Sequence, residues 1–465
     1  MRKSRVVAVA VAAALIVGAA TANAQERRRP FGTLREQATL QQTWLEKRLK
    51  TVLPALMRKH GIDMWVIPMR EYMEDPTFTS LVSPTTFAAR RRTIYVFFDK
   101  CAAGGQTDPG DGSCVERIAL GGTSQGGLYE AVRSTIAVDA DVGGRQAELW
   151  GDAQWQVLKD VLEQRNPKVL GINSSRVFAF SDGLTSGEVE GMALALGTEW
   201  TSRIRKAEAL PLEFIASRLP EEEQFYRRLQ NLVWDLIGRM YSTEVIKPGV
   251  TRTSDLVWWW RQQVNDLGLD TWFQPSIDVQ RLGVTAEQLG DDPVIQKGDV
   301  LHCDVGITAL RLNTDTQHMA YVLRDGETDA PPGLKAALKN ANRLQDILFE
   351  ETRVGRTGNE ILASTLAKMK AEGLNGTMYS HPIGMHGHGA GPLIGLWDYQ
   401  EGVPGRGDAK VSPGMWYSSE LQVTTPVPEW NNQPVRVAQE EDFIIDAAGK
   451  LRWALRRQAA WHLVM

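Results

Sequence analysis

The chain has 465 residues, of which 43% are hydrophobic and 23% are charged, and its formal net charge is −4 at pH 7. This length suggests two or three domains, and the composition is that of a soluble globular protein, which excludes disordered and collagen-like classes. A mildly acidic chain carries no electrostatic footprint for nucleic acid, so no nucleic-acid partner is expected.

The N-terminus has the three parts of a secretory signal peptide. Three cations lie within the first five residues, residues 6–20 form an apolar run, and a Thr-Ala-Asn-Ala segment ends at Ala24. We therefore predict that residues 1–24 are removed and that the mature protein is periplasmic or secreted, with no membrane partner. The alternative is an uncleaved anchor, although the run is short for a span of about 20 residues. Removal of the three cations takes the formal charge from −4 to −7.

Residues 25–210 alternate between helical and strand patterns, which predicts an α/β N-terminal domain. Leucines and a tryptophan recur at helical spacing across residues 34–60, and Gly61 ends this pattern. A further helix is predicted at about 150–164. Apolar segments predict strands at 64–68, 93–98, 117–120 and 168–172.

The three cysteines predict one disulfide and one buried thiol. Cys101 and Cys114 flank a loop rich in glycine and aspartate, and in an oxidising compartment they are placed to form a disulfide. Cys303 lies within an apolar segment, which favours a buried and unreactive thiol.

Residues 211–465 form the second predicted domain, in which helices precede and separate groups of strands. Pro220 opens a helix to about residue 245, with three glutamates in its first turn, where the helix dipole favours acids. The whole chain is predicted to be α+β. The remaining elements are predicted as helices at 253–266, 333–352 and 357–372, and strands within 270–325 and from 377 onward.

Two aspartates in this second domain are the first candidates for chemistry. Asp304 lies in VLHCDVGI and Asp315 in NTDTQHMAYVL, two segments that we expect to pair as a hairpin. With the turn centred between Ala309 and Leu310, Asp304 stands opposite Asp315 and both side chains share one face. Two adjacent carboxylates in an apolar sheet repel each other and lose hydration, and bound cations remove both problems.

Three further candidate segments follow along the chain. His381, His386 and His388 lie in the glycine-rich segment SHPIGMHGHGAGP, Glu420 lies in PGMWYSSEL, and Glu440 lies in VRVAQEEDFIID. Four carboxylates and one imidazole, with no thiolate, favour two divalent ions that share bridging carboxylates. The oxygen-rich set favours Mn²⁺, with Zn²⁺ or Co²⁺ as alternatives. Any one of these segments is a weak signal, and their order together carries the prediction.

These segments resemble the motifs of the pita-bread metallopeptidases, the creatinase and methionine aminopeptidase-like family, and most of all its Xaa-Pro aminopeptidase and prolidase branch. Asp304 and Asp315 lie 11 residues apart, as the two aspartates of the family do. The segment that begins at His381 resembles H-x-x-G-x-x-x-H, and the one that ends at Glu420 resembles G-M-x-F-x-x-E. The segment that begins at Glu440 resembles E-D-D-I-x-I.

The resemblance implies a dinuclear centre with a role for each ligand. Asp304 would chelate one metal ion, whereas His381 and Glu420 would hold the other. Asp315 and Glu440 would bridge the two ions.

The resemblance also implies a fold and catalytic roles. It covers about residues 220–465 and implies a pita-bread catalytic domain preceded by a smaller creatinase-like α/β domain. Glu420 would be the general base for the attacking water, and His388 would contact the substrate and stabilise the oxyanion.

Departures from the family pattern leave alternatives open. The segment FQPSIDVQR upstream of Asp304 lacks the family's histidine, and Gln317 or His318 takes the place of an arginine. Another arginine position holds Ala438, with Arg436 two residues earlier.

The histidine alignment is also not unique. The segment His388-Gly-Ala-Gly resembles H-G-x-G, which would make His388 the ligand in place of His381. That alignment lacks the histidine seven residues on, where this chain has Gly395. His386 is expected to support the site from outside or to lie on the surface.

The function implied by the resemblance is an exported Xaa-Pro aminopeptidase that hydrolyses the bond before a proline in second position. Proline lacks an N–H and fixes φ, so its peptide bonds resist general peptidases. Trp397, Trp416 and Tyr417 are candidates for an apolar pocket that accepts the proline ring. The alternatives are a prolidase-type dipeptidase, another amide or C–N hydrolase, and a non-catalytic pita-bread binding module. Family analogy suggests a homodimer.

Overall fold

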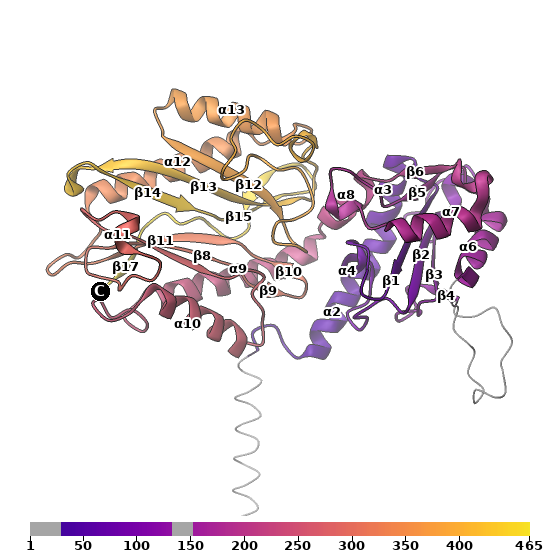
Figure 1. Cartoon of the computed structure of the whole chain (residues 1–465), viewed down its shortest axis with the longest axis horizontal. Helices are drawn as coiled ribbons and strands as arrows, with labels where there is room; N and C mark the ends of the chain where they lie inside the picture. Colours follow the sequence, from indigo (N-terminus) through magenta and orange to yellow (C-terminus); the bar gives the residue numbers. More distant parts are fainter. Residues whose placement is uncertain (1–28, 133–151) are drawn as a thin grey trace, which may run out of the picture.

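The computed structural model describes residues 29–132 and 152–465, and the predicted signal peptide lies outside these ranges. The chain forms two parts that lie side by side, an N-terminal part around one sheet and a C-terminal part around two facing sheets (Figure 1). This mixed architecture confirms the predicted α+β class. Within the described ranges, no helix is long and apolar enough to cross a membrane.

The N-terminal part is built on a six-stranded mixed sheet in the order β4-β3-β2-β1-β5-β6. Trp65 and Ile67 belong to one hydrophobic cluster and Met64 and Val66 to another, so successive residues of β1 face opposite sides. The sheet is therefore buried on both faces. Its strands are β1 (Met64–Arg70), β2 (Arg92–Asp99), β3 (Val115–Leu120), β4 (Glu130–Val132), β5 (Leu170–Ile172) and β6 (Ile204–Lys206).

The helices of this part confirm the predictions for residues 34–60 and about 150–164 and add four that were not predicted, of which α7 is the longest. Arg48 lies at the start of a π-helical turn inside the long helix. Its buried guanidinium donates to the backbone carbonyls of Phe214 and Ser217. The helix α7 was not predicted because its glycines and uniform hydropathy hide the helical period. The helices are α2 (Leu34–Lys47), the π-turn (Arg48–Val52), α3 (Leu53–His60), α4 (Phe78–Leu81), α5 (Lys100–Ala103), α6 (Asp152–Arg165), α7 (Ser186–Thr201) and α8 (Ala209–Ala216).

The cysteines follow the prediction. Cys101 and Cys114 form a disulfide that closes the loop between α5 and β3. Cys303 is a free and buried thiol, and burial raises its pKa to about 12, which makes it a poor nucleophile.

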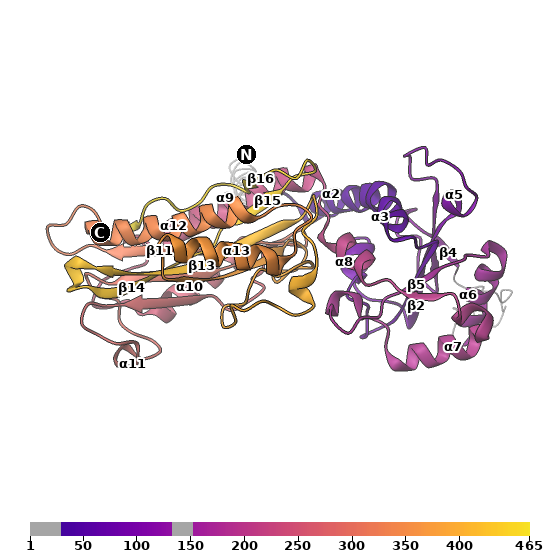
Figure 2. The same ribbon diagram turned by 90° about the horizontal axis from the view of Figure 1, so that it is seen from above.

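The C-terminal part consists of two sheets that face each other, with helices on the outside. Figures 1 and 2 show α12 and α13 outside one sheet and α9 and α10 outside the other. One sheet has the order β17-β11-β8-β7, and the other has β12-β13-β15-β16 with β14 also paired to β13. This sandwich leaves an interior into which strands of both sheets can direct polar side chains.

The element boundaries agree with the predicted helices to within a few residues, except that α9 ends earlier, at residue 240. The helices are α9 (Pro220–Met240), α10 (Thr253–Asp266), α11 (Ala286–Leu289), α12 (Pro332–Glu351) and α13 (Gly358–Ala371). The strands of the first sheet are β7 (Ser276–Gln280), β8 (Val300–Val305), β11 (Thr316–Val322) and β17 (His462–Val464). Those of the second are β12 (Gly376–Ile383), β13 (Trp416–Val427), β14 (Gln433–Gln439), β15 (Asp442–Ile445) and β16 (Leu451–Trp453).

The turn between β8 and β11 differs from the predicted one. Leu310 and Arg311 occupy its centre with φ of 51° and 62°, between the short strands β9 (Thr308–Ala309) and β10 (Leu312–Asn313). The predicted pairing of Asp304 with Asp315 is therefore wrong, and Asp304 lies opposite Gln317. A shift of two residues keeps both aspartates on one face, since side chains alternate with a period of two.

Two non-glycine residues with positive φ explain why this turn could not be read from the sequence. Part of the conformation is held by contacts from far along the chain. The Arg311 guanidinium donates to the carbonyls of Thr79 at 2.8 Å and Val82 at 2.7 Å in the N-terminal part.

Candidate metal centre

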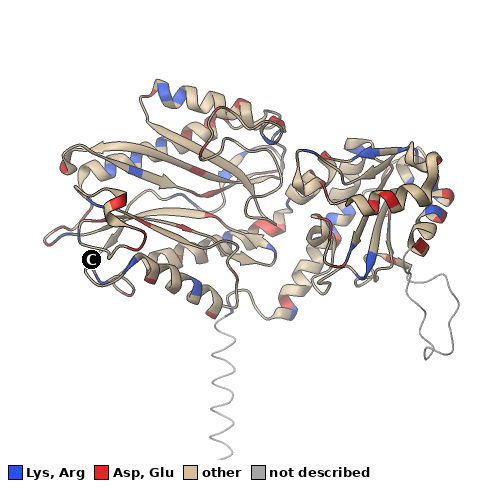
Figure 3. Cartoon of the chain, viewed as in Figure 1, with Lys and Arg blue, Asp and Glu red and all other residues tan. Residues whose placement is uncertain are grey.

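The five predicted ligand side chains come from both sheets and meet between them. Asp304 lies on β8 and Asp315 just before β11, whereas His381 lies on β12, Glu420 on β13 and Glu440 directly after β14. Figure 3 shows acidic positions on the strands of both sheets, between the two layers of helices. The two sheets also join at this point, because Gln317 and Glu440 exchange two backbone hydrogen bonds of 3.1 Å.

The donor atoms form three overlapping groups, and within each group they all lie within 4.8 Å of one another. Glu440, Asp315 and His381 each belong to two of these groups. Of the three, only the two carboxylates offer the pair of oxygens that a bridging ligand needs. The groups are Asp304–Asp315–Glu440, His381–Glu420–Glu440 and Asp315–His381–His388.

The His381 ring is buried and presents one nitrogen to the carboxylates. Its Nδ1 lies 3.1 Å from the Pro382 carbonyl, to which it donates. Its Nε2 then carries the lone pair, and it lies 3.2 Å from Glu440 Oε1 and 3.7 Å from Asp315 Oδ2. A lone pair that faces carboxylate oxygens needs a positive charge between them, and a backbone bond to the other ring nitrogen is the usual support of a ligating histidine.

The carboxylates lack the partners that burial requires. One oxygen of Asp304 and one of Asp315 are buried without a hydrogen-bond partner among the described residues. Burial, reinforced by the neighbouring carboxylates, raises the pKa of Asp304, Asp315, Glu420 and Glu440. Groups in this situation either take up protons or bind cations. Divalent cations fit this set, because hard oxygen donors outnumber the single nitrogen.

A chain of hydrogen bonds holds the Glu440 carboxylate in place. Gln317 Nε2 donates to Glu440 Oε2 at 2.7 Å, and the Ser418 hydroxyl donates to Glu440 Oε1 at 2.6 Å. The amide oxygen of Gln317 lies 2.8 Å from His302 Nε2, and His302 Nδ1 lies 3.1 Å from Asp278 Oδ2. These contacts orient the Glu440 carboxylate toward the other ligands.

Sequence reasoning did not assign these supporting residues. The available signal was the alternation of His302 with Asp304, which places both on one face of β8. Gln317 needed the cross-strand register, since only its position opposite Asp304 brings it to the site.

The two glycine-flanked histidines beyond His381 lie in different surroundings. The exposed His388 ring meets His381 edge to face at 4.8 Å between centroids and Trp272 at 5.3 Å. Burial, with smaller contributions from His381 and Arg406, lowers the pKa of His388 to about 4, which keeps it neutral at pH 7. His386 belongs to none of the donor groups and packs against Phe180 at 4.8 Å.

A cavity of about 460 Å³, here called the central cavity, opens onto Asp304 and Glu420. Trp397 stands at its rim with 71% of its surface exposed. Trp416 and Tyr417 do not line it, so the prediction that they form an apolar pocket is wrong. Both are buried in packing, Trp416 against Tyr226 at 4.4 Å and Tyr417 in a stack on a phenylalanine of β15.

Residues 226–447 match the model of metallopeptidase family M24. The C-terminal part belongs to metallopeptidase family M24. The M24 domain contains all five predicted ligands, and the match confirms the resemblance that their motifs suggested. No curated protein sequence matches this chain closely enough to count as a relative.

Solved structures share the fold of the M24 domain together with that of the N-terminal part. The X-Pro aminopeptidase of Thermotoga maritima has a TM-score of 0.57 at 13% identity, with 88% of this chain and 100% of that chain covered. The Xaa-Pro dipeptidase of Bacillus anthracis has a TM-score of 0.56 at 16% identity, with 90% and 99% covered. The N-terminal domain of FACT complex subunit SPT16 from chickpea (Cicer arietinum) has a TM-score of 0.54 at 13% identity, with 91% and 99% covered. These likenesses confirm the predicted pita-bread fold with a creatinase-like N-terminal domain.

Proposed function

We propose that this protein is an exported dinuclear metallo-aminopeptidase that removes the first residue from peptides with proline in second position. The observation that carries the proposal is the convergence of five donor side chains, from both sheets of an M24 domain, at the end of one cavity. The division into a domain of residues 25–210 and a catalytic domain of residues 211–465 is part of the proposal, as is a homodimer.

The metal ligands in this proposal are the five residues Asp304, Asp315, His381, Glu420 and Glu440. Their unpartnered oxygens and their four-to-one excess of carboxylate over imidazole support two divalent ions, with Mn²⁺ as the expected metal. When bound, such ions would supply Lewis acidity toward a substrate carbonyl and toward the attacking water.

Glu420 is proposed as the general base. Its side chain is 24% exposed and lines the central cavity, whereas the side chains of Asp315 and Glu440 are 5% and 1% exposed. The nitrogen of the cleaved bond belongs to the proline and carries no proton in the intact peptide. It can leave only as a protonated amine, so a carboxylate that takes the proton from water must pass it on to that nitrogen.

His388 is proposed to stabilise the oxyanion. It is exposed beside the Asp315–His381 pair, and its lowered pKa keeps the ring neutral, with one N–H able to donate. A neutral donor placed beside the reacting carbonyl stabilises the negative charge that develops there.

The charges along the central cavity support an aminopeptidase orientation. The carboxylates Asp304 and Glu420 line this cavity, as does Arg436, which lies four residues before Glu440 and is paired with Asp278. A peptide that enters with its amino group toward the acids and its carboxyl end toward Arg436 matches both charges.

The proposal is tested with the mature chain loaded with Mn²⁺ and a panel of Xaa-Pro dipeptides and Xaa-Pro-Yaa tripeptides. We expect release of the free first residue from the tripeptides, and Glu420→Gln should lack this activity while the protein stays folded. Cleavage of dipeptides alone would indicate a prolidase. A protein that retains no metal and cleaves none of the peptides would be a binding module, which contradicts the proposal.

Export is tested on the protein isolated from its producing cells. Sequencing of the mature N-terminus should begin at Gln25 if the predicted signal peptide is removed. A mature protein that still begins at Met1 would contradict this part of the proposal.

A further inference from the structure

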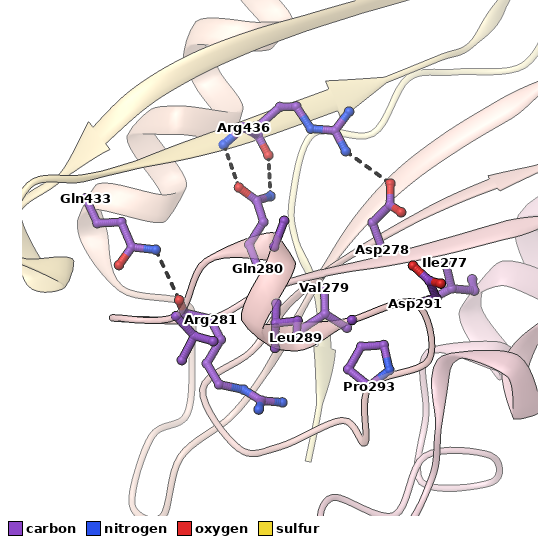
Figure 4. A pocket seen from close by; sticks show the side chains of 13 residues that line it. Ile277, Asp278, Val279, Gln280, Arg281, Leu289, Asp291, Pro293, Gln433 and Arg436 are labelled. Carbon is purple, nitrogen blue, oxygen red and sulfur yellow. Dashed lines mark hydrogen bonds and ion pairs between the residues drawn. The ribbon is translucent and has the colours of Figure 1, made fainter.

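A second cavity, of about 600 Å³, adjoins the central cavity, and the two share Asp278 and Arg436 as lining residues. We call it the distal cavity. It lies between the edge strand β7 with the short helix α11 on one side and the first half of β14 on the other (Figure 4). The Asp278–Arg436 pair thus lies where the two cavities meet, and we call it the partition.

The partition is an ion pair that can open. Arg436 Nη2 lies 3.1 Å from Asp278 Oδ2, and the two side chains are 39% and 52% exposed. A pair this exposed contributes little to stability, because water and salt screen it. A ligand that contacts either charge can therefore displace the other without a large cost.

The walls of the distal cavity present backbone groups that glutamine amides now occupy. Gln280 accepts from the Arg436 N–H at 2.8 Å and donates to the Arg436 carbonyl at 2.7 Å. Gln433 likewise donates to the Arg281 carbonyl at 3.1 Å and accepts from the Gly283 N–H at 2.7 Å. A primary amide here makes the paired bonds that a peptide unit of an added strand would make. The walls are therefore complementary to an extended peptide backbone.

The side chains of the cavity add an apolar surface with a charged rim. Val279, Leu289 and Pro293 give the apolar surface, and Figure 4 shows them on the same side as Asp291. Arg436 is the cation on the opposite wall. A peptide with apolar residues near its carboxyl end would place those residues on the apolar surface and its terminal carboxylate near Arg436.

The spacing along β14 sets the length of peptide that reaches the distal cavity. Arg436 lies four residues before Glu440. At a strand rise of about 3.4 Å per residue these positions are roughly 13–14 Å apart. An extended peptide covers the same distance with about four residues. Only peptides of about five residues or more would enter the distal cavity.

We propose that the distal cavity binds the C-terminal residues of oligopeptide substrates, whose chain runs from the metal centre along β14 and past the opened Asp278–Arg436 pair. The inference rests on the proposed aminopeptidase function, because an enzyme that removes the first residue leaves the whole remaining peptide on one side of the cleaved bond. The ligand class is an extended oligopeptide with apolar residues from about the fifth position onward.

The test is a length series of Xaa-Pro peptides from three to eight residues, with leucine at every position after the fourth. We expect kcat/KM to rise about tenfold between four and seven residues, mainly through KM, and then to level off. Leu289→Trp, which places a large ring in the distal cavity only, should abolish this rise and leave tripeptide cleavage unchanged. Ala286→Phe on α11 is a second filling variant at an exposed position.

Val250→Trp is the matched control, because it adds a tryptophan at a 70% exposed site that lines neither cavity. The control should keep the rise with length. A kcat/KM that does not change with length, or a rise that persists in both filling variants, would overturn the inference while tripeptide cleavage upholds the proposed function. Absence of cleavage at every length would overturn both.

Discussion

The imidazole rings of His381 and His388 meet edge to face, with centroids 4.8 Å apart, although one ring is buried and the other exposed. The buried ring points Nε2 at three carboxylates, of Asp315, Glu420 and Glu440, within 3.9 Å. Among the described residues, the exposed His388 ring belongs to only one of the three groups of donor atoms, together with Asp315 and His381. This arrangement favours His381 as the ligand, and it turns the ambiguity between the two sequence alignments into a measurable difference.

We expect His381→Ala to lose bound metal and His388→Ala to keep it. The second variant should lose roughly 10²- to 10³-fold in kcat, the usual cost of removing one oxyanion donor. Metal content after dialysis and steady-state kinetics on an Xaa-Pro-Yaa tripeptide measure the two effects. The reverse result, with metal lost from His388→Ala alone, would assign the ligand role to His388.

Gln317→Leu should weaken metal binding without removing a ligand. The side chain donates to Glu440 Oε2 at 2.7 Å, and loss of such a support typically lowers metal affinity by about 10- to 100-fold. A competition titration with a chelator gives the affinity, and Gln422→Leu, a polar lining residue outside the donor groups, serves as the control. Equal affinities for wild type and Gln317→Leu would show that this contact does not support the centre.

Trp397 and Trp416 should respond oppositely to truncation. Trp397 is 71% exposed at the rim of the central cavity, so Trp397→Ala is expected to change stability by less than about 0.5 kcal/mol and to raise KM for proline peptides. Trp416 is 2% exposed, so Trp416→Ala should cost about 3–5 kcal/mol of unfolding free energy. Urea denaturation and kinetics test the pair, and an unchanged KM for Trp397→Ala would remove its proposed contact with substrate.

The contribution of two buried histidines to stability is expected to fall as the solution is acidified below pH 6.5. Burial lowers the pKa of His318 and of His462 to about 3, and their rings lie in contact, with Nδ1 of His318 3.0 Å from Nε2 of His462. At these two histidines the unfolded chain, with a pKa near 6.5, binds more protons than the folded chain between about pH 3 and pH 6.5, so their contribution to stability rises with pH across that window. For the buried His318 this amounts to about 2 kcal/mol between pH 6.5 and pH 5.

The measurement is chemical denaturation at pH 5.0, 6.0 and 7.0 for the wild type and His462→Gln. The variant should lose stability less steeply on acidification, because one titrating ring is absent. Parallel pH dependences would contradict the assignment, and His60→Gln provides a control at a partly exposed histidine of α3.

Hydrophobic period and capping residues were sufficient to predict most long helices. The pattern of residues 34–60 and that after Pro220 both place apolar residues at helical spacing, and tertiary packing preserved them. The helix over residues 186–201 carries almost no amphipathic signal, and so it required the structure.

The candidate ligands could be predicted because each lies in a short motif that survives at low identity. The residues that hydrogen-bond to these ligands could not be predicted, because their position at the site depends on cross-strand pairing. The turn centre lies one residue later than predicted, at Leu310 and Arg311, and this shift places Gln317, rather than Asp315, opposite Asp304. Which aromatic residues reach the cavity was equally hidden, since it depends on which neighbour covers each ring, as Tyr226 covers Trp416.

The proposed ligands are divided between two sheets, with Asp304 and Asp315 from one and His381, Glu420 and Glu440 from the other. A pair of ions held by all five ligands would therefore link the two sheets to each other. Removal of the ions with a chelator would leave the four carboxylates facing one another between the sheets, where their charges repel. The apoprotein would then exchange backbone amide hydrogens faster along both sheets, so that an unloaded enzyme is structurally loosened as well as inactive.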